Sequence, residues 1–271
     1  MSNNTPKEGN MTNIDPALYN GAYKACMFSY PAISSGSCAT TLSKTRAVHL
    51  LERYISDYVS QKKSSRYYEV VETLGALQTL GPYLKAIAAE MSLDFMHKNV
   101  VETYVFGKWP QNLNTDKVFD NLLGELAKTG VNKTLLKFMA QKAPKPFLPF
   151  HGYQTLLKGL DDTNEKKIAG ATKCMVREGI VLDTNRKNKA TVLTRCLRFD
   201  QENGGYVFEN CKNEASYKTN FLDYIVMTQN MRVAIHQGWV MDIILDQDKE
   251  IFDTLSERNT EVVKLFETYG L

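Results

Sequence analysis

Apolar residues recur every three or four positions along much of the chain, and this pattern predicts a mainly helical fold. The clearest case is residues 41–59, whose apolar positions share one helical face and where Ser43 is available as a cap. Further helical periods cover residues 67–80, 82–97, 116–128, 131–141, 151–160 and 163–178. Residues 1–16 are polar and show no such period. We therefore expect the amino-terminal segment, residues 1–40, to be mobile or loosely ordered.

The pattern changes after Gly179. Residues 180–199 are rich in β-branched side chains on both sides of an Asn-rich turn, which predicts an antiparallel β-hairpin with its tip at residues 184–190. A second tight turn at residues 203–205 predicts a short third strand. From residue 215 the helical period returns, which predicts a helix of roughly 30 residues, or two helices with a break near Gly238.

Together these elements predict an α+β fold that is mainly α, a helical bundle with a small antiparallel β-hairpin. We expect a helical domain over residues 41–212, with the hairpin near 180–208, and long carboxy-terminal helices over 213–271, the last of them at 253–268. Residues 100–106 fit either a strand or an extended connection. The 271 residues, 43% hydrophobic and 23% charged, are typical of a globular chain that buries a core.

A membrane location is not expected from this sequence. No run approaches the roughly 20 apolar residues of a membrane helix, and the start of the chain is polar where a signal peptide is apolar. The five cysteines show no metal or redox spacing. We therefore expect reduced thiols, a cytoplasmic location and no membrane partner.

Sequence patterns of known catalytic and cofactor sites are absent. There is no P-loop, no G-x-G-x-x-G, no H-E-x-x-H, no G-x-S-x-G and no C-x-x-C. The four histidines are scattered singly, and although His151 and His236 each lie near an aspartate in the sequence, a single histidine is more often structural than catalytic. The sequence therefore predicts no catalytic residue, no metal site and no cofactor in this chain.

Charge is distributed unevenly, although the net charge is only +3. Residues 158–198 contain ten basic and five acidic residues, whereas residues 240–271 contain three basic and eight acidic ones. The predicted hairpin tip carries Arg186, Lys187 and Lys189 beside two asparagines. A projecting cationic tip is typical of proteins that contact nucleic-acid phosphates. A solvated helix face and an acidic tail helix explain the same charges without a ligand.

The order of these pieces resembles the amino-terminal half of the single-subunit DNA-dependent RNA polymerases of phages and mitochondria. In that family a basic loop between helices touches upstream promoter DNA, a helix leads into an intercalating β-hairpin, and a helix bearing Trp-x-Ile-Asn follows. The matching positions are Lys62, Lys63 and Arg66 for the basic loop, 167–181 for the helix, 184–190 for the hairpin tip and 234–242 (AIHQGWVMD) for the Trp element. The family's Pro-Pro-x-Pro-Trp stretch is missing between hairpin and Trp element, and its D-x-R-G-R segment and palm aspartates are not in this sequence.

The resemblance implies a non-catalytic, DNA-binding subunit of a split phage RNA polymerase. It implies promoter and bubble DNA as the ligand, the host cytoplasm as the location, and a second polymerase chain as partner, which carries the palm, the fingers and the catalytic Mg²⁺. The nucleic-acid-binding residues it implies are Lys62, Lys63, Arg66, Arg177, Asn185, Arg186, Lys187, Asn188, Lys189, Arg195 and Arg198. The partner interface would be an apolar face with Ile235, Trp239 and Ile243, although the core of this chain is the competing interpretation for Trp239.

Two other functions fit the same sequence. A mostly helical protein with an amino-terminal arm can coat single-stranded RNA as a viral nucleoprotein, which predicts assemblies with a strong salt dependence. An adaptor without a nucleic-acid role would instead dock a basic partner on the acidic carboxy-terminal helices. Preference for bubble DNA without self-assembly would favour the polymerase subunit, and filaments or rings with RNA would favour the nucleoprotein.

Overall fold

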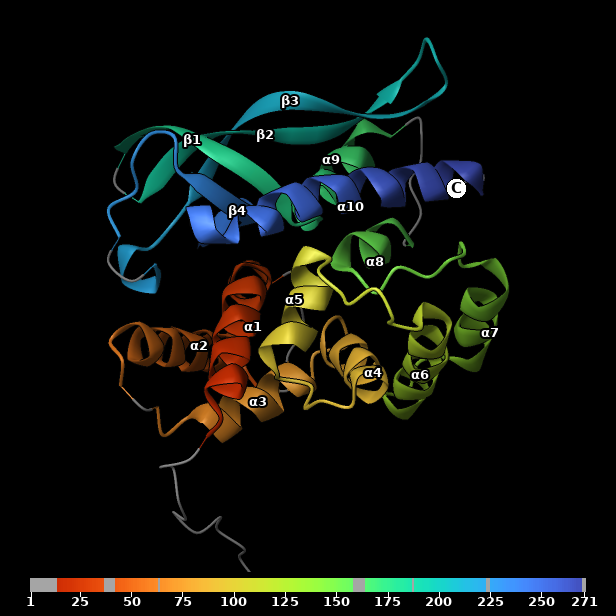
Figure 1. Ribbon diagram of the computed structural model, residues 1–271, viewed down its shortest axis with the longest axis horizontal. Helices are drawn as coiled ribbons and strands as arrows, with labels where there is room; N and C mark the ends of the chain where they lie inside the picture. The colour runs from red at the N-terminus through yellow and green to blue at the C-terminus, as the bar shows by residue number, and fades with distance from the viewer. Residues whose placement is uncertain are drawn as a thin grey trace, which may run out of the picture.

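A computed structural model describes residues 14–36, 42–62, 64–157, 164–186, 188–222 and 225–269. Within these ranges the chain forms a helical lobe and a lobe built around a β-barrel (Figure 1). Helix α10 (Lys249–Thr268) runs along the boundary between the two lobes. One hydrophobic core passes through both, so the barrel and the helices are stabilised together.

The helical lobe confirms most of the periodic pattern. Its described helices are α1 (Pro16–Ser35), α2 (Lys44–Val59), α3 (Tyr67–Gly75), α4 (Gly81–Met91), α5 (Lys98–Phe106), α6 (Thr115–Lys128) and α7 (Lys133–Lys142). Ser43 caps α2 as expected, because its hydroxyl accepts from the backbone N–H of Arg46. Residues 100–106 are helical, neither strand nor extended connection. They are all buried, so α5 has no polar face to reveal its period.

Helix α1 corrects the expectation of a loosely ordered segment over residues 1–40. The Asp15 carboxylate accepts from the Ala17 N–H, and Pro16 occupies the first turn, where proline is favoured. The helix packs against α2, α3 and α5, and its second half is buried without interruption from residue 25 to 33. A helix covered on nearly all sides shows no amphipathic period, which is why the pattern missed it. Residues 1–13 and 37–40 of the expected segment lie outside the described ranges.

The predicted hairpin is part of a five-stranded barrel. Its strands are β1 (Arg177–Arg186), β2 (Lys189–Asp200), β3 (Gly205–Ser216), β4 (Arg232–His236) and β5 (Trp239–Ile244), closed in the order β1-β2-β3-β5-β4. Neighbouring strands are antiparallel, except that β3 meets β5 in parallel at Ser216 and Trp239. This strand order is that of an OB-type Greek-key barrel. The fold is therefore α+β as predicted, with a larger β part than a hairpin.

Strands β4 and β5 correct the prediction of long helices over residues 213–271. Gln237 and Gly238 both have positive φ, at 53° and 76°, and form the two-residue turn of a tight hairpin. Short apolar runs on either side of such a turn fit helix and strand equally well, so the period alone misled the prediction. In the described part of this region, the one long helix is α10, and the short 3-10 turns are η2 (Thr219–Phe221) and η3 (Asp246–Asp248). The expected domain boundary after residue 212 falls inside β3.

The turn between β1 and β2 is not a free-standing finger. Strand β2 pairs with β3 along its whole length, from Lys189 with Ser216 to Asp200 with Gly205. The Tyr217 N–H also donates to the carbonyl of Asn188, so the turn lies at the barrel rim beside the end of β3. The segment that projects is the opposite end of the same pair, the β2–β3 arm, which extends away from the barrel in Figure 1.

Two short helices join the lobes. Helix α8 (His151–Leu157) packs against α10, and α9 (Glu165–Cys174) packs against β2. The helix predicted over 163–178 is shorter, because Asn164 caps α9 and β1 begins at Arg177. None of the helices in the described ranges combines the length and the apolar character needed to cross a bilayer.

A cationic pocket between helix α9 and the barrel

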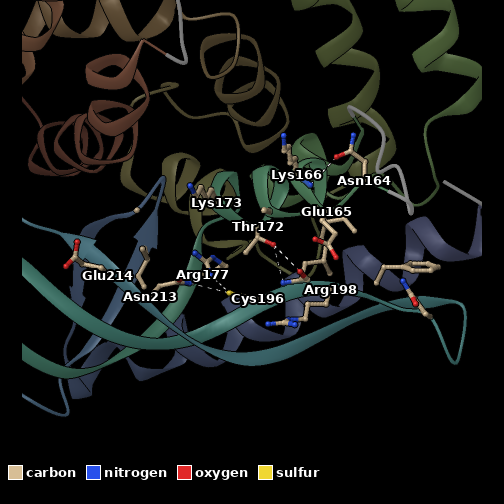
Figure 2. A pocket seen from close by; sticks show the side chains of 17 residues that line it. Asn164, Glu165, Lys166, Thr172, Lys173, Arg177, Cys196, Arg198, Asn213 and Glu214 are labelled. Atoms are coloured by element: carbon tan, nitrogen blue, oxygen red, sulfur yellow. Dashed lines mark hydrogen bonds between the residues drawn. The ribbon is translucent and has the colours of Figure 1, made fainter.

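A pocket of about 1040 Å³ lies between α9 and strands β2 and β3; we call it the α9 pocket (Figure 2). One wall is α9, and the other is formed by the barrel and the base of the β2–β3 arm. The lining residues that matter below are Lys166, Lys173, Arg177, Arg198, Phe199 and Asn213. The cation-rich stretch seen in the sequence thus folds around a concavity.

Arg177 is the most unusual residue of the pocket. Only 3% of it is exposed, its Nη1 donates to the Arg195 carbonyl at 2.9 Å, and its Nε is buried without a hydrogen-bond partner among the described residues. Burial lowers the pKa of Arg177 to about 10, although Glu178 opposes the shift, so the guanidinium stays charged at neutral pH. A buried cation without a paired carboxylate is costly unless an anion approaches it. Arg177 therefore favours an anionic ligand in the α9 pocket.

The charges around Arg177 reinforce this preference. Lys166 and Lys173 are exposed on α9, and neither forms an ion pair within the described part of the chain. Arg198 pairs with Glu209 at 3.0 Å, and the pocket residue Glu214 pairs with Lys189. Among the described residues, the pocket lining therefore retains one acidic residue without an ion pair, Glu165. It retains three such cations, which are Lys166, Lys173 and Arg177. The local potential is positive, which attracts phosphates or carboxylates.

A disulfide in the barrel wall corrects the expectation of reduced thiols. Cys196 of β2 and Cys211 of β3 are bonded, with their Cα atoms 5.9 Å apart. The Asn213 side-chain amide donates to both sulfurs, at 3.3 and 3.4 Å. Strand register places the two cysteines diagonally on neighbouring strands, since Cys196 pairs with Glu209. Their spacing in the sequence carries no such information, because it depends on the β2–β3 pairing.

A second group of residues meets directly behind the α9 pocket. His151 at the start of α8, Cys174 at the end of α9 and His236 at the end of β4 each place one ligand atom within 4.8 Å of the others. The group adjoins the pocket wall, because Gln237 N–H donates to the Lys173 carbonyl at 2.8 Å. The sequence pattern does not reveal the group, since its members come from three elements far apart in the chain.

The family of this chain follows from its sequence. A sequence model described as a family of unknown function, DUF6390, matches residues 57–268. The chain belongs to this family. The range that matches DUF6390 includes every residue named so far for the α9 pocket and the His/Cys group, whereas α1 precedes it. Neither the curated proteins nor the solved structures give a match.

In this DUF6390 protein the residues expected to bind nucleic acid are dispersed. Arg177 and Arg198 line the α9 pocket. Arg195 instead pairs with Glu178 at 2.8 Å and donates to the Ser256 carbonyl, so it connects the barrel to α10. Lys189 pairs with Glu214 on the neighbouring strand. Two of these four cations therefore hold the barrel together instead of facing a ligand.

Of the remaining expected contacts, those that the structure describes do not line the pocket. Lys62 and Arg66 lie in the connection between α2 and α3, in the helical lobe (Figure 1). Asn188 is exposed at the β1–β2 turn with a positive φ of 60°. Lys63 and Lys187 lie outside the described residues, as do the side chains of Asn185 and Arg186. The structure thus separates the expected basic loop from the barrel site of this DUF6390 protein.

Of the residues expected at a partner interface, one is buried in the DUF6390 fold and two are half-buried. Ile235 is buried in β4, and Ile243 is half-buried in β5. The Trp239 ring meets Tyr30 of α1 edge to face, with ring centroids 5.5 Å apart. The interface prediction assumed one apolar helix face, whereas alternation along two strands divides these residues between inner and outer positions. The competing interpretation, that Trp239 belongs to the core, describes its packing better.

Proposed function

We propose that this protein binds single-stranded nucleic acid in the α9 pocket. The observation that carries the proposal is Arg177, a buried cation that borders an open pocket and has no paired carboxylate among the described residues. Lys166 and Lys173 extend the positive surface along α9, where they can neutralise successive phosphates. The volume of about 1040 Å³ is at the upper end of the range for small-molecule pockets, which suits a segment of a polymer.

The barrel supports this choice of ligand. In OB-type barrels the face of strands 2 and 3, with the adjoining loops, binds oligonucleotides and oligosaccharides. Here β2 brings Phe199 to the pocket, and the ring of Tyr206 on β3 lies 5.3 Å from it, edge to face. Single-stranded nucleic acid binds where cations follow the backbone and aromatic rings stack on bases. The α9 pocket offers both kinds of contact, and its positive charge favours nucleic acid over a neutral oligosaccharide.

The subunit of a split phage RNA polymerase, implied by the sequence resemblance, stays a prediction and is a narrower form of this proposal. It requires a preference for promoter bubbles, a cytoplasmic location and a second chain with the catalytic Mg²⁺. Because the β1–β2 turn lies at the barrel rim, we assign the single strand to the α9 pocket and not to an intercalating hairpin tip. The viral nucleoprotein, the alternative function, is also a form of this proposal. It differs from the polymerase subunit because it requires the protein to assemble with itself along RNA.

A binding panel tests the proposal and separates these forms. Fluorescence anisotropy would compare labelled single-stranded DNA, single-stranded RNA, duplex DNA and bubble DNA at about 50 and 200 mM salt. We expect single strands and bubbles to bind more tightly than duplex, with affinity that falls as salt rises. Bubble preference favours the polymerase subunit, and binding with assembly on RNA favours the nucleoprotein. Failure to bind any of the four nucleic acids at low salt would refute the proposal, and binding of small phosphorylated compounds in their place would assign the pocket to a metabolite.

A further inference from the structure

We propose that His151, Cys174 and His236 bind a zinc ion that fastens α9 to the barrel. This inference rests on the His/Cys group alone and does not depend on the proposed nucleic-acid function. The three residues belong to α8, α9 and β4, so one ion would join three elements at the boundary between the lobes.

The spacing of the donors fits a tetrahedral ion. The Cys174 Sγ lies 3.6 Å from the His151 Nε2, and one ligand atom from each of the three residues lies within 4.8 Å of the others. Zinc bonds of about 2.3 Å to sulfur and 2.0–2.1 Å to nitrogen place two tetrahedral ligands roughly 3.5 Å apart. One pair is therefore already at ligand spacing, and the third donor needs only a small side-chain adjustment.

His236 is oriented as a metal ligand. Its Nδ1 lies 2.9 Å from the Phe28 carbonyl, so the ring proton sits on Nδ1 and the lone pair on Nε2. That Nε2 is buried, in a residue only 2% exposed, and has no hydrogen-bond partner among the described residues. The Phe28 ring stacks on the imidazole with centroids 4.4 Å apart, which fixes its plane.

His151 has the supporting contacts that a second imidazole ligand needs. Its Nδ1 lies 2.9 Å from the Tyr104 hydroxyl and 3.2 Å from the Gln154 side-chain oxygen, while its Nε2 lies 2.9 Å from the Cys174 carbonyl. In the structure Nε2 faces an acceptor and so carries the ring proton. Binding an ion would move that proton to Nδ1, where Gln154 accepts it, and Nε2 would turn from the Cys174 carbonyl to the metal. Cys174 would bind as the thiolate, and its thiol proton would pass to solvent.

The donor set selects the class of ion. One thiolate and two imidazoles are typical ligands of zinc, whereas magnesium and calcium prefer oxygen. Three protein ligands leave the fourth position of a tetrahedral ion to water. Because Cys174 ends α9 and Lys173 lines the α9 pocket, the ion would hold one wall of that pocket in place.

Metal content measures the proposal directly. The full chain, purified without chelators, should contain one zinc per chain by mass spectrometry. After exchange with cobalt(II), it should show the thiolate charge-transfer band and the intense visible bands of a tetrahedral site. Cys174→Ser and His236→Asn should each lose at least nine-tenths of the metal and of the cobalt spectrum. Cys26→Ser, a buried thiol on α1, and His49→Gln, an exposed histidine on α2, should keep both.

Thermal unfolding keeps the test decisive if a ligand variant folds poorly. Adding zinc to the metal-free wild-type chain should raise its thermal midpoint, and a strong chelator should reverse the rise. Folded wild-type protein that takes up neither zinc nor cobalt, or a Cys174→Ser variant that keeps the cobalt spectrum, would overturn the proposal. Uptake of copper(I) in preference to zinc would overturn the choice of ion. A loss of nucleic-acid binding with full zinc content would fault the proposed function and leave this inference standing.

Discussion

Arg177 connects the stability of this protein to its proposed ligand. Its guanidinium is buried and forms no ion pair in the described structure, so the folded state carries an electrostatic cost that an anion would relieve. Neighbouring Arg195 has the opposite character, since Glu178 and α10 surround it. The two arginines were indistinguishable in the sequence, and their surroundings separate a ligand contact from a structural one.

Replacing Arg177 with methionine tests this distinction. Arg177→Met should raise the free energy of unfolding by about 1 kcal/mol, because an unpaired buried charge is removed. The same variant should weaken binding of single-stranded DNA at least about tenfold, or 1.4 kcal/mol. Urea unfolding and fluorescence anisotropy measure the two effects. As a control, Arg195→Met should lose about 2–3 kcal/mol of stability and retain its affinity. A variant at Arg177 that unfolds more easily and still binds would show that the residue is structural.

Phe199 should contribute affinity without affecting the dependence on salt. Phe199→Ala should weaken single-strand binding by about 1–3 kcal/mol, the value of stacking one base on an aromatic ring. The slope of log affinity against log salt should stay unchanged, because no phosphate contact is lost. Tyr68→Ala serves as the control, because it removes an exposed aromatic ring from the helical lobe, away from the α9 pocket, and should leave the affinity unchanged. An unchanged affinity for Phe199→Ala would exclude stacking at this ring.

Contacts between elements explain how the barrel attaches to the helices. Glu52 of α2 accepts from Lys218 Nζ at 2.6 Å and from the Tyr30 hydroxyl at 2.8 Å, and Lys218 directly precedes η2. Burial raises the pKa of Glu52, but the hydrogen bonds from Lys218 and Tyr30 outweigh it, so the pKa is lowered. A carboxyl group whose pKa is lowered by folding stabilises the folded state at pH values above its ordinary pKa. This stabilisation is lost as the pH falls from the ordinary pKa through the lowered pKa of the folded state.

Glu52→Gln should therefore change stability in a pH-dependent manner. At about pH 7 the variant should be less stable than the wild type by about 0.5–1 kcal/mol, since the contact is partly exposed. The difference should shrink as the pH falls below the ordinary pKa of a glutamate, because the wild-type carboxyl then becomes protonated. Urea unfolding at several pH values measures the difference. A gap between the two proteins that stays constant with pH would contradict the assigned ion pair.

The elements that the sequence predicted well are those with one apolar face. Helix α2 and the hairpin of β1 and β2 have local signals, an amphipathic period with a cap and an Asn-rich turn between β-branched strands. Helix α1 was missed because burial on nearly all sides removes the periodic contrast. Strands β4 and β5 were missed because short apolar runs fit helix and strand equally well. The cation-rich stretch was visible in the sequence, but which cations face a pocket depended on the barrel register. The disulfide and the His/Cys group depend on tertiary contacts in the same way.

At the scale of the whole molecule, the α9 pocket lies between helix α9 and the base of the projecting β2–β3 arm (Figure 2). The His/Cys group lies behind it, between the lobes, so the wall of the pocket is supported by residues that a ligand does not touch.

The salt dependence of single-strand binding tests the central claim most directly. Lys166→Ala combined with Lys173→Ala removes two exposed pocket cations, and Lys133→Ala combined with Lys137→Ala removes two exposed cations from α7 as a matched control. At about 0.7 counterions per phosphate contact, the pocket variant should lower the salt slope by up to about 1.4. Its affinity at low salt should fall, while the α7 variant should match the wild type. Equal slopes for all three proteins would contradict the α9 pocket as the nucleic-acid site.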